Sequence, residues 1–132
     1  IISGWLNEYF NTATCLAIKS HFNSTTDTFI ADFYQTKSLH HITSVCKILP
    51  QLLSKDRKLK NSVQDYFNTF FIRHISPMCK QQGISTINLV GSIALNFFSL
   101  INETASLHEI TITSCIDKPI QNLLKYHLSQ KK

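Results

Sequence analysis

The segment 87–98, Ile-Asn-Leu-Val-Gly-Ser-Ile-Ala-Leu-Asn-Phe-Phe, constrains the fold most, because its apolar β-type run stops at Gly91 and a helical pattern begins at Ser92. A strand that passes directly into a helix leaves free backbone N–H groups at the carboxyl end of a sheet. Gly91 has no side chain, so a ligand can approach the main chain there. The same residues also fit an ordinary turn between a strand and a helix, since one Gly-Ser pair is a weak motif.

The rest of the C-terminal part, residues 83–128, alternates strands and helices. After the strand at 87–90 and its helix, residues 109–115 alternate apolar and polar positions as a half-buried strand does. Pro119 stands where the first position of a last helix is expected. A strand, a crossover helix and a second strand of this length predict a parallel pair. We therefore predict the order β-α-β-α in this part.

Residues 1–82 show helical patterns instead. Trp5, Leu6, Tyr9 and Phe10 have the spacing of one helix that continues to about Phe22. The stripe from 39 to 53 predicts another helix, which Pro50 should kink or end. The fold class predicted for the whole chain is thus α/β, with a helix-rich N-terminal two thirds.

The clearest helix covers about Asn61 to Cys79. Its apolar residues advance by three and four in turn, which places them on one face that we expect to be buried. A histidine on such a face is more often a hydrogen-bonded core residue than a metal ligand. The face consists of Val63, Tyr66, Phe67, Phe70, Phe71, His74 and Ile75.

The composition indicates a single globular domain, 1–132, with 43% hydrophobic and 16% charged residues. Much of the net charge of +5 comes from the run 55–60 and the last two lysines, so we expect no nucleic-acid partner. Asn88 and Asn96 interrupt the longest apolar tract, and we expect no membrane-spanning segment. The four cysteines include no Cys-x-x-Cys pair, which favours reduced thiols in a cytoplasmic protein over disulfides or a zinc site.

Two separated motifs together resemble one known family. The sequence Val-Gly-Ser-Ile-Ala at 90–94 is followed, after a helix and a strand, by Asp-Lys-Pro-Ile-Gln-Asn-Leu-Leu-Lys-Tyr-His at 117–127. This order resembles the end of the BadF/BadG/BcrA/BcrD ATPases, which include N-acetylglucosamine-kinase-like proteins. Asn122 stands where the family motif has glycine. The order and rough spacing of the helical segments agree with the family over nearly the whole chain.

The resemblance implies the actin-like ATPase superfamily, whose members have two ribonuclease-H-like lobes with ATP between them. This chain would be most of the C-terminal lobe. Phosphate loops need glycines, and this chain has only three, which is consistent with those loops lying outside it. On the family pattern, Gly91 and Ser92 would face the adenosine part of ATP. Ala94 would keep the first helical turn slim, and Asn96 or Asn88 would add a polar contact. Catalytic residues and Mg²⁺ ligands would lie outside this chain, so none is assigned here.

The resulting hypothesis is the ATP-binding lobe of a sugar kinase, inactive as an isolated fragment. The sugar substrate would bind through the missing N-terminal lobe. The apolar surface of Trp5 or Phe29 would meet that lobe or a second subunit, and a homodimer is left open. Two alternatives remain: a non-enzymatic, helix-rich interaction module, and an activator-type ATPase of the same family. The sequence leaves the acceptor sugar undetermined.

Overall fold

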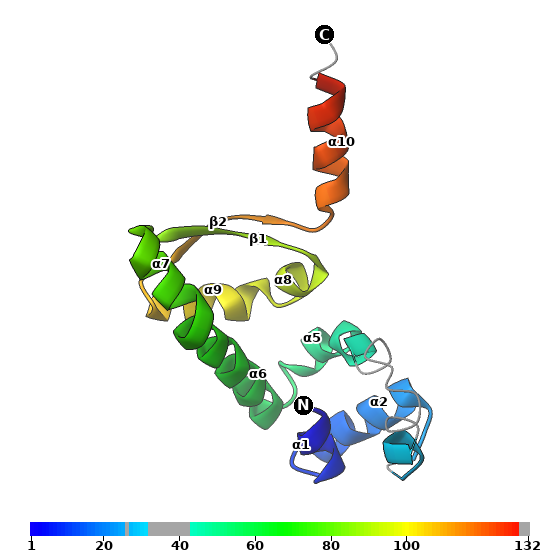
Figure 1. The fold of residues 1–132 in the computed structure, drawn as a ribbon. Coiled ribbons are helices and arrows are strands. Elements are labelled where there is room, and N and C mark those ends of the chain that lie inside the picture. Colours follow the sequence, from blue (N-terminus) through cyan, green and yellow to red (C-terminus); the bar gives the residue numbers. More distant parts are fainter. Residues whose placement is uncertain (26, 32–42, 130–132) are drawn as a thin grey trace. The chain divides into compact units, whose positions relative to one another are not determined.

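The computed structural model describes residues 1–25, 27–31 and 43–129. The chain divides into two compact units, Ile1–Val63 and Gln64–Lys132, so each unit is described by itself. The first unit is helical, and the second contains helices and a small sheet, as Figure 1 shows. This confirms the predicted helix-rich, mixed α/β class.

Two short helices replace the single helix predicted between Trp5 and Phe22. They are α1 (Ile2–Leu6) and α2 (Thr12–Phe22). The chain turns between them, where Glu8 adopts a left-handed backbone conformation with φ of 52°. The side chain of Asn11 then accepts a hydrogen bond of 2.8 Å from Thr14 N–H and begins α2. This cap is the physical reason for the break.

A helical segment at 27–31 follows, and then η1 (Ser44–Lys47), a 3₁₀ turn, and α5 (Leu49–Leu52). Residues 39–42 of the predicted helix lie outside the described residues. The predicted helix ends just before Pro50, as expected: η1 ends at Lys47, and Pro50 lies in the first turn of a new helix, α5. A proline is tolerated there, since the first N–H groups of a helix have no partner within the helix.

Three aromatic rings pack together in the core of the first unit. Phe22 lies 4.6 Å from Phe29 and 5.6 Å from Trp5 between ring centroids, and Trp5 meets Phe29 edge to face at 5.1 Å. All three side chains are buried. The expectation that Trp5 or Phe29 offers apolar surface to a partner is therefore wrong, because these rings cover one another.

The long helix predicted from Asn61 to Cys79 is a run of three segments, α6 (Arg57–Phe70), the π-helical η2 (Phe71–Ile75) and α7 (Ser76–Gln82). A π turn accommodates one extra residue, so residues on the same helical face are spaced one position further apart across it. Phe71 is buried with 2% of its surface exposed, whereas His74 is exposed. Tyr66 and Phe70 are 65% and 51% exposed, so the prediction of a wholly buried face is wrong for these three residues.

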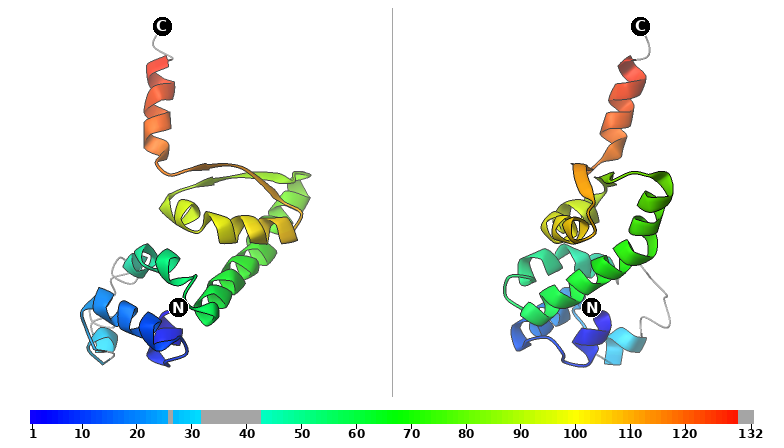
Figure 2. Two further views of the ribbon diagram at one scale, coloured as in Figure 1. Left: turned by 180° about the vertical axis from the view of Figure 1, so that it is seen from behind. Right: turned by 90° about the vertical axis from the view of Figure 1, so that its left-hand side faces the viewer.

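The β-α-β-α order of the second unit is confirmed. Its elements are β1 (Thr86–Val90), α8 (Ser92–Asn96), α9 (Phe98–Leu107), β2 (Thr111–Ile116) and α10 (Pro119–Ser129). The strands pair in parallel, with one irregularity between Ile87 and Asn88. Figure 2 shows α8 and α9 along one side of the two strands. The crossover helix is divided at Phe97, which is buried.

Two helices of this unit end in the same kind of turn. At the end of α7, Gly83 has φ of 64°, and Ile84 N–H donates to Cys79 C=O at 3.0 Å. At the end of α9, Glu109 has φ of 58°, and Ile110 N–H donates to Ala105 C=O at 2.9 Å. This Schellman turn favours glycine at the left-handed position. Glu109 is therefore a strained substitute for it.

Candidate functional site

The strand-to-helix junction is formed as the sequence predicts. β1 ends at Val90, α8 begins at Ser92, and Gly91 between them has φ of 107° and ψ of 164°. Only glycine adopts this backbone region readily. The conformation explains why a residue without a side chain stands at this point.

The N–H group of Gly91 is not free, because it donates a 2.8 Å hydrogen bond to Ile116 C=O at the end of β2. The C=O group of Gly91 accepts from Leu95 N–H at 3.1 Å. Both main-chain groups of Gly91 are thus used within the fold. The free donors expected at this junction are the first N–H groups of α8 instead.

The space around Gly91 is open. A Cβ atom built on Gly91 would have no heavy atom within 4 Å, apart from its neighbours in the chain. Gly91 itself is only half-buried. The main chain at the carboxyl end of β1 is therefore accessible to a flat molecule lying against it.

The other predicted site residues follow Gly91 on α8. Ser92 is exposed, and no side-chain hydrogen bond caps this helix. Asn96 is exposed four residues later, on the same helical face as Ser92. Ala94 is half-buried. The structure thus brings Gly91, Ser92 and Asn96 together at one accessible corner.

Asn88 has a structural role in the sheet. Its Oδ1 atom accepts hydrogen bonds from Thr113 Oγ1 at 2.6 Å and from Ser114 Oγ at 2.8 Å. These bonds join β1 to β2 beside the irregularity in their pairing. The Oδ1 atom of Asn88 is therefore already engaged, which favours Asn96 over Asn88 as a polar contact at the corner.

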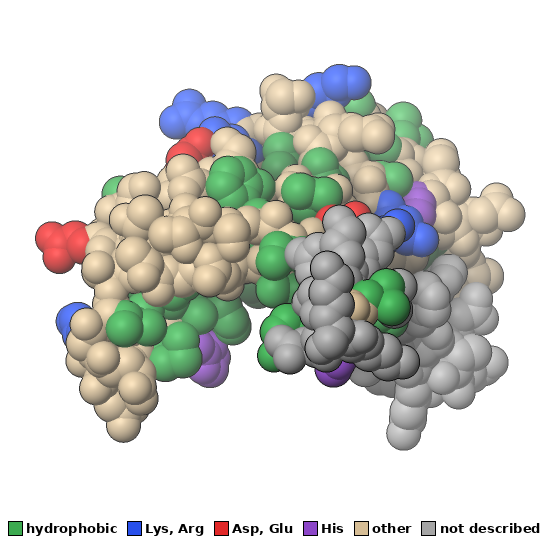
Figure 3. Space-filling view, turned by 90° about the horizontal axis from the view of Figure 1, so that it is seen from above, with side chains coloured by type: hydrophobic (Ala, Val, Ile, Leu, Met, Phe, Trp, Pro, Cys, Tyr) green, Lys and Arg blue, Asp and Glu red, His purple; other side chains and the backbone are tan. Residues whose placement is uncertain are grey.

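An apolar groove of about 470 Å³ adjoins the corner, and sequence reasoning did not identify it. Ala94 and Ile93 of α8 line it, together with Leu89 of β1 and with Tyr66 and Phe70 of α6. The sequence feature that points to this groove is the regular spacing of aromatic residues along the predicted helix from Asn61 to Cys79. The sequence analysis interprets that face as buried core. On the face drawn in Figure 3, hydrophobic side chains likewise reach the surface in several places.

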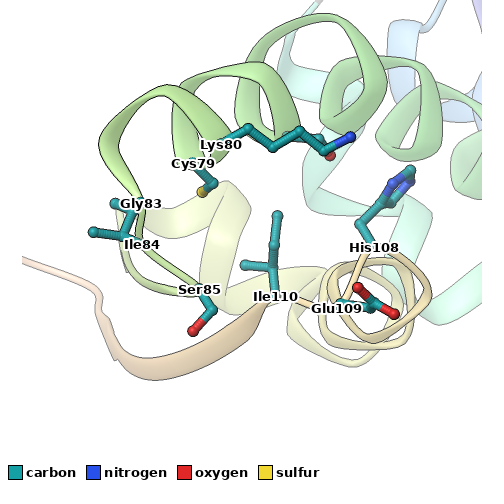
Figure 4. A pocket seen from close by; sticks show the side chains of 9 residues that line it. Cys79, Lys80, Gly83, Ile84, Ser85, His108, Glu109 and Ile110 are labelled. Carbon is teal, nitrogen blue, oxygen red and sulfur yellow. The ribbon is translucent and has the colours of Figure 1, made fainter.

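A second hollow, of about 280 Å³, lies at the opposite end of β1. Figure 4 shows Lys80 extending over it toward His108, with Cys79 and Ile110 on its floor and Glu109 at one side. His108 is fixed by a 2.8 Å hydrogen bond between its Nε2 atom and Asn68 Oδ1. None of the predicted site residues lines this hollow.

The described residues contain no group of three histidine, cysteine or acidic side chains that could hold a metal ion. The four cysteines are free. None of the helices in the described ranges has both the length and the apolar character needed to cross a membrane.

Comparison with known proteins finds a similar fold but no similar sequence. Neither the protein-family models nor the curated proteins match the sequence. A solved structure does match the fold: the "Putative N-acetylglucosamine Kinase" from Porphyromonas gingivalis, with a TM-score of 0.81 and 19% sequence identity. The match covers 96% of this chain. At this identity it shows a shared fold alone.

The chain spans only 44% of the length of that structure. Residues 1–132 therefore have the fold of somewhat less than half of the Porphyromonas gingivalis protein.

Proposed function

We propose that this chain is the nucleotide-binding lobe of an N-acetylglucosamine-kinase-like sugar kinase, with the ribonuclease-H-like lobe fold of actin-like ATPases. The complete enzyme transfers the γ-phosphoryl group of Mg-ATP to a sugar hydroxyl in the cytoplasm. The observation that carries the proposal is the accessible main chain at Gly91, in a fold shared with the Porphyromonas gingivalis protein.

In this proposal Gly91 gives the adenosine part of ATP a flat backbone surface to lie against. The side chains of Ser92 and Asn96 are exposed on one face of α8 and supply hydrogen-bonding groups to the ribose or base. Ala94 leaves space beside the first turn because its side chain is a single methyl group. Mg²⁺ and the sugar are held by residues outside the chain, so the isolated chain binds nucleotide weakly and turns over none.

The test is a calorimetric titration of residues 1–132 with Mg-ATP and Mg-ADP. The wild type should show saturable binding, and Gly91→Trp should abolish it by filling the open space. Gly83→Trp is the matched control, because Gly83 also has positive φ and open space where its Cβ atom would lie. Circular dichroism should show that both variants fold.

Two results would contradict the proposal. One is the absence of saturable binding by the wild type at any Mg²⁺ concentration. The other is an equal loss of binding in both tryptophan variants, which would indicate an effect of strain rather than of position.

A non-enzymatic interaction module is the second candidate, favoured by the apolar groove and the net charge of +5. Such a module would bind an acidic partner and no nucleotide. The titration above separates the two candidates directly.

A further inference from the structure

The second hollow, of about 280 Å³, is bordered by two opposite charges that do not pair with each other. Lys80 extends over it from α7, and Glu109 lies at one side, just after the end of α9 (Figure 4). Neither side chain forms an ion pair or a hydrogen bond with another residue in the part of the chain that the structure describes. A molecule that enters the hollow therefore meets one ammonium group and one carboxylate.

The wall of the hollow also contains an unsatisfied polar atom. Ser76 of α7 lines the hollow, and its Oγ atom is buried without a hydrogen-bond partner. Buried hydroxyl groups normally have a partner, because an unpaired one loses its hydration without compensation. A polar ligand in the hollow supplies that partner once the serine side chain turns toward it.

The remaining lining is held in place by the fold. The His108 ring stacks on Phe71, with centroids 5.7 Å apart and 18° between the ring planes, and its Nε2 atom is hydrogen-bonded to Asn68 Oδ1. On the floor, Cys79 and Ile110 are 3% and 5% exposed. A hollow whose walls are already ordered loses little conformational freedom when a ligand binds.

We infer that this hollow binds a small zwitterion, a molecule with one amine and one carboxylate joined by a short carbon chain, as in an amino acid. Lys80 binds the carboxylate, Glu109 binds the ammonium group, and the carbon chain lies over Ile110. A simple anion is attracted by Lys80 but repelled by Glu109, and a simple cation has the reverse difficulty. A volume of about 280 Å³ admits a molecule of this size. This inference does not depend on nucleotide binding.

Calorimetric titration of residues 1–132 tests it. The probes are glycine, β-alanine and γ-aminobutyrate, which hold the two charges at increasing separation, and the controls are butyrate and butylamine, which carry one charge each. At least one zwitterion should bind saturably and about tenfold or more tightly than either control, because only a zwitterion engages both charges. Butyrate binding as tightly as the zwitterions would indicate a plain anion site and would contradict the inference. So would the absence of saturable binding by every zwitterion up to about 20 mM.

Substitutions at the two charges provide the second readout. Lys80→Met and Glu109→Gln should each weaken binding of the zwitterion about tenfold or more, and both should keep the melting temperature of the wild type because both positions are exposed. Lys118→Met is the matched control, an exposed lysine outside the hollow. Ser76→Ala should weaken binding without lowering the melting temperature of the free chain, since its hydroxyl has no partner to lose. Wild-type affinity in Glu109→Gln, or an equal loss in Lys118→Met and Lys80→Met, would overturn the inference.

Discussion

The interaction between Asp56 and Asn11 joins the beginnings of two helices and gives the sharpest test of the first unit. Asp56 is 3% exposed, and its two carboxylate oxygens accept from Leu59 N–H at 3.1 Å and from Asn11 N–H at 2.8 Å. Asn11 in turn caps α2 and donates from Nδ2 to Lys55 C=O at 2.9 Å. One carboxylate thus caps α6 and positions the residue that caps α2.

We expect Asp56→Ala to lower the free energy of unfolding by about 3 kcal/mol. Loss of a helix cap costs about 1 kcal/mol. Loss of a hydrogen bond to a charged acceptor costs about 1.5–3 kcal/mol, and the part-buried bond from Asn11 N–H to the Asp56 carboxylate is of this kind. Asp56→Asn should lower the free energy of unfolding by less than Asp56→Ala does, because the amide oxygen of the asparagine still accepts one of the two hydrogen bonds.

The same carboxylate predicts a dependence on pH. Burial raises the pKa of Asp56, but the hydrogen bonds from the N–H groups of Asn11 and Leu59 outweigh burial and hold the pKa below its ordinary value. The unfolded chain therefore binds the proton more readily than the folded chain. The contribution of Asp56 is present above the ordinary aspartate pKa of about 3.9 and is lost as the pH falls through the lower folded value.

Urea unfolding followed by fluorescence measures both effects, because Trp5 is the single tryptophan and is buried in the first unit. Asp65→Ala is the control, since Asp65 is exposed on α6 and should change stability by less than about 0.5 kcal/mol. A loss below about 1 kcal/mol for Asp56→Ala would refute the reasoning about the caps. Equal acid sensitivity of the wild type and Asp56→Asn would refute the reasoning about pH.

Two further predictions concern the second unit, each measured by calorimetric melting. Glu109→Gly should raise stability by about 1 kcal/mol, because it removes the strain of a left-handed non-glycine residue at a helix end; an unchanged or lower melting temperature would indicate that the Glu109 side chain is itself stabilising. Phe71→Ala should cost about 3–5 kcal/mol, because the ring is almost fully buried. Phe70→Ala, at an exposed position, is its control, and similar losses for the two would contradict the observed burial.

The sheet and its junction were predictable because their signals are local. Alternating apolar residues specify each strand, and a glycine between a strand and a helix specifies the sharp change of direction at Gly91. The cap at Asn11 was equally local, an asparagine just before a helical pattern, and the sequence analysis missed it by extending one helix through it.

The exposure of Tyr66 and Phe70 could not be predicted in this way. Spacing shows which residues share a helical face, but it does not show whether anything packs against that face. The π turn at 71–75 is also invisible to spacing, because no residue type specifies it. The groove, which depends on both features, was therefore outside the reach of sequence reasoning.

The π turn has a consequence for insertions and deletions in this segment. A π turn absorbs one extra residue while the α-helical residues before and after it keep their faces. Removing one residue between Phe71 and Ile75 would therefore let the backbone return to regular α-helical bonding and would leave Cys79 in the interior. The same deletion within the regular turns of α6 would rotate every later helical residue by about 100°. The stretch 71–75 should thus tolerate the loss of one residue that α6 would not tolerate.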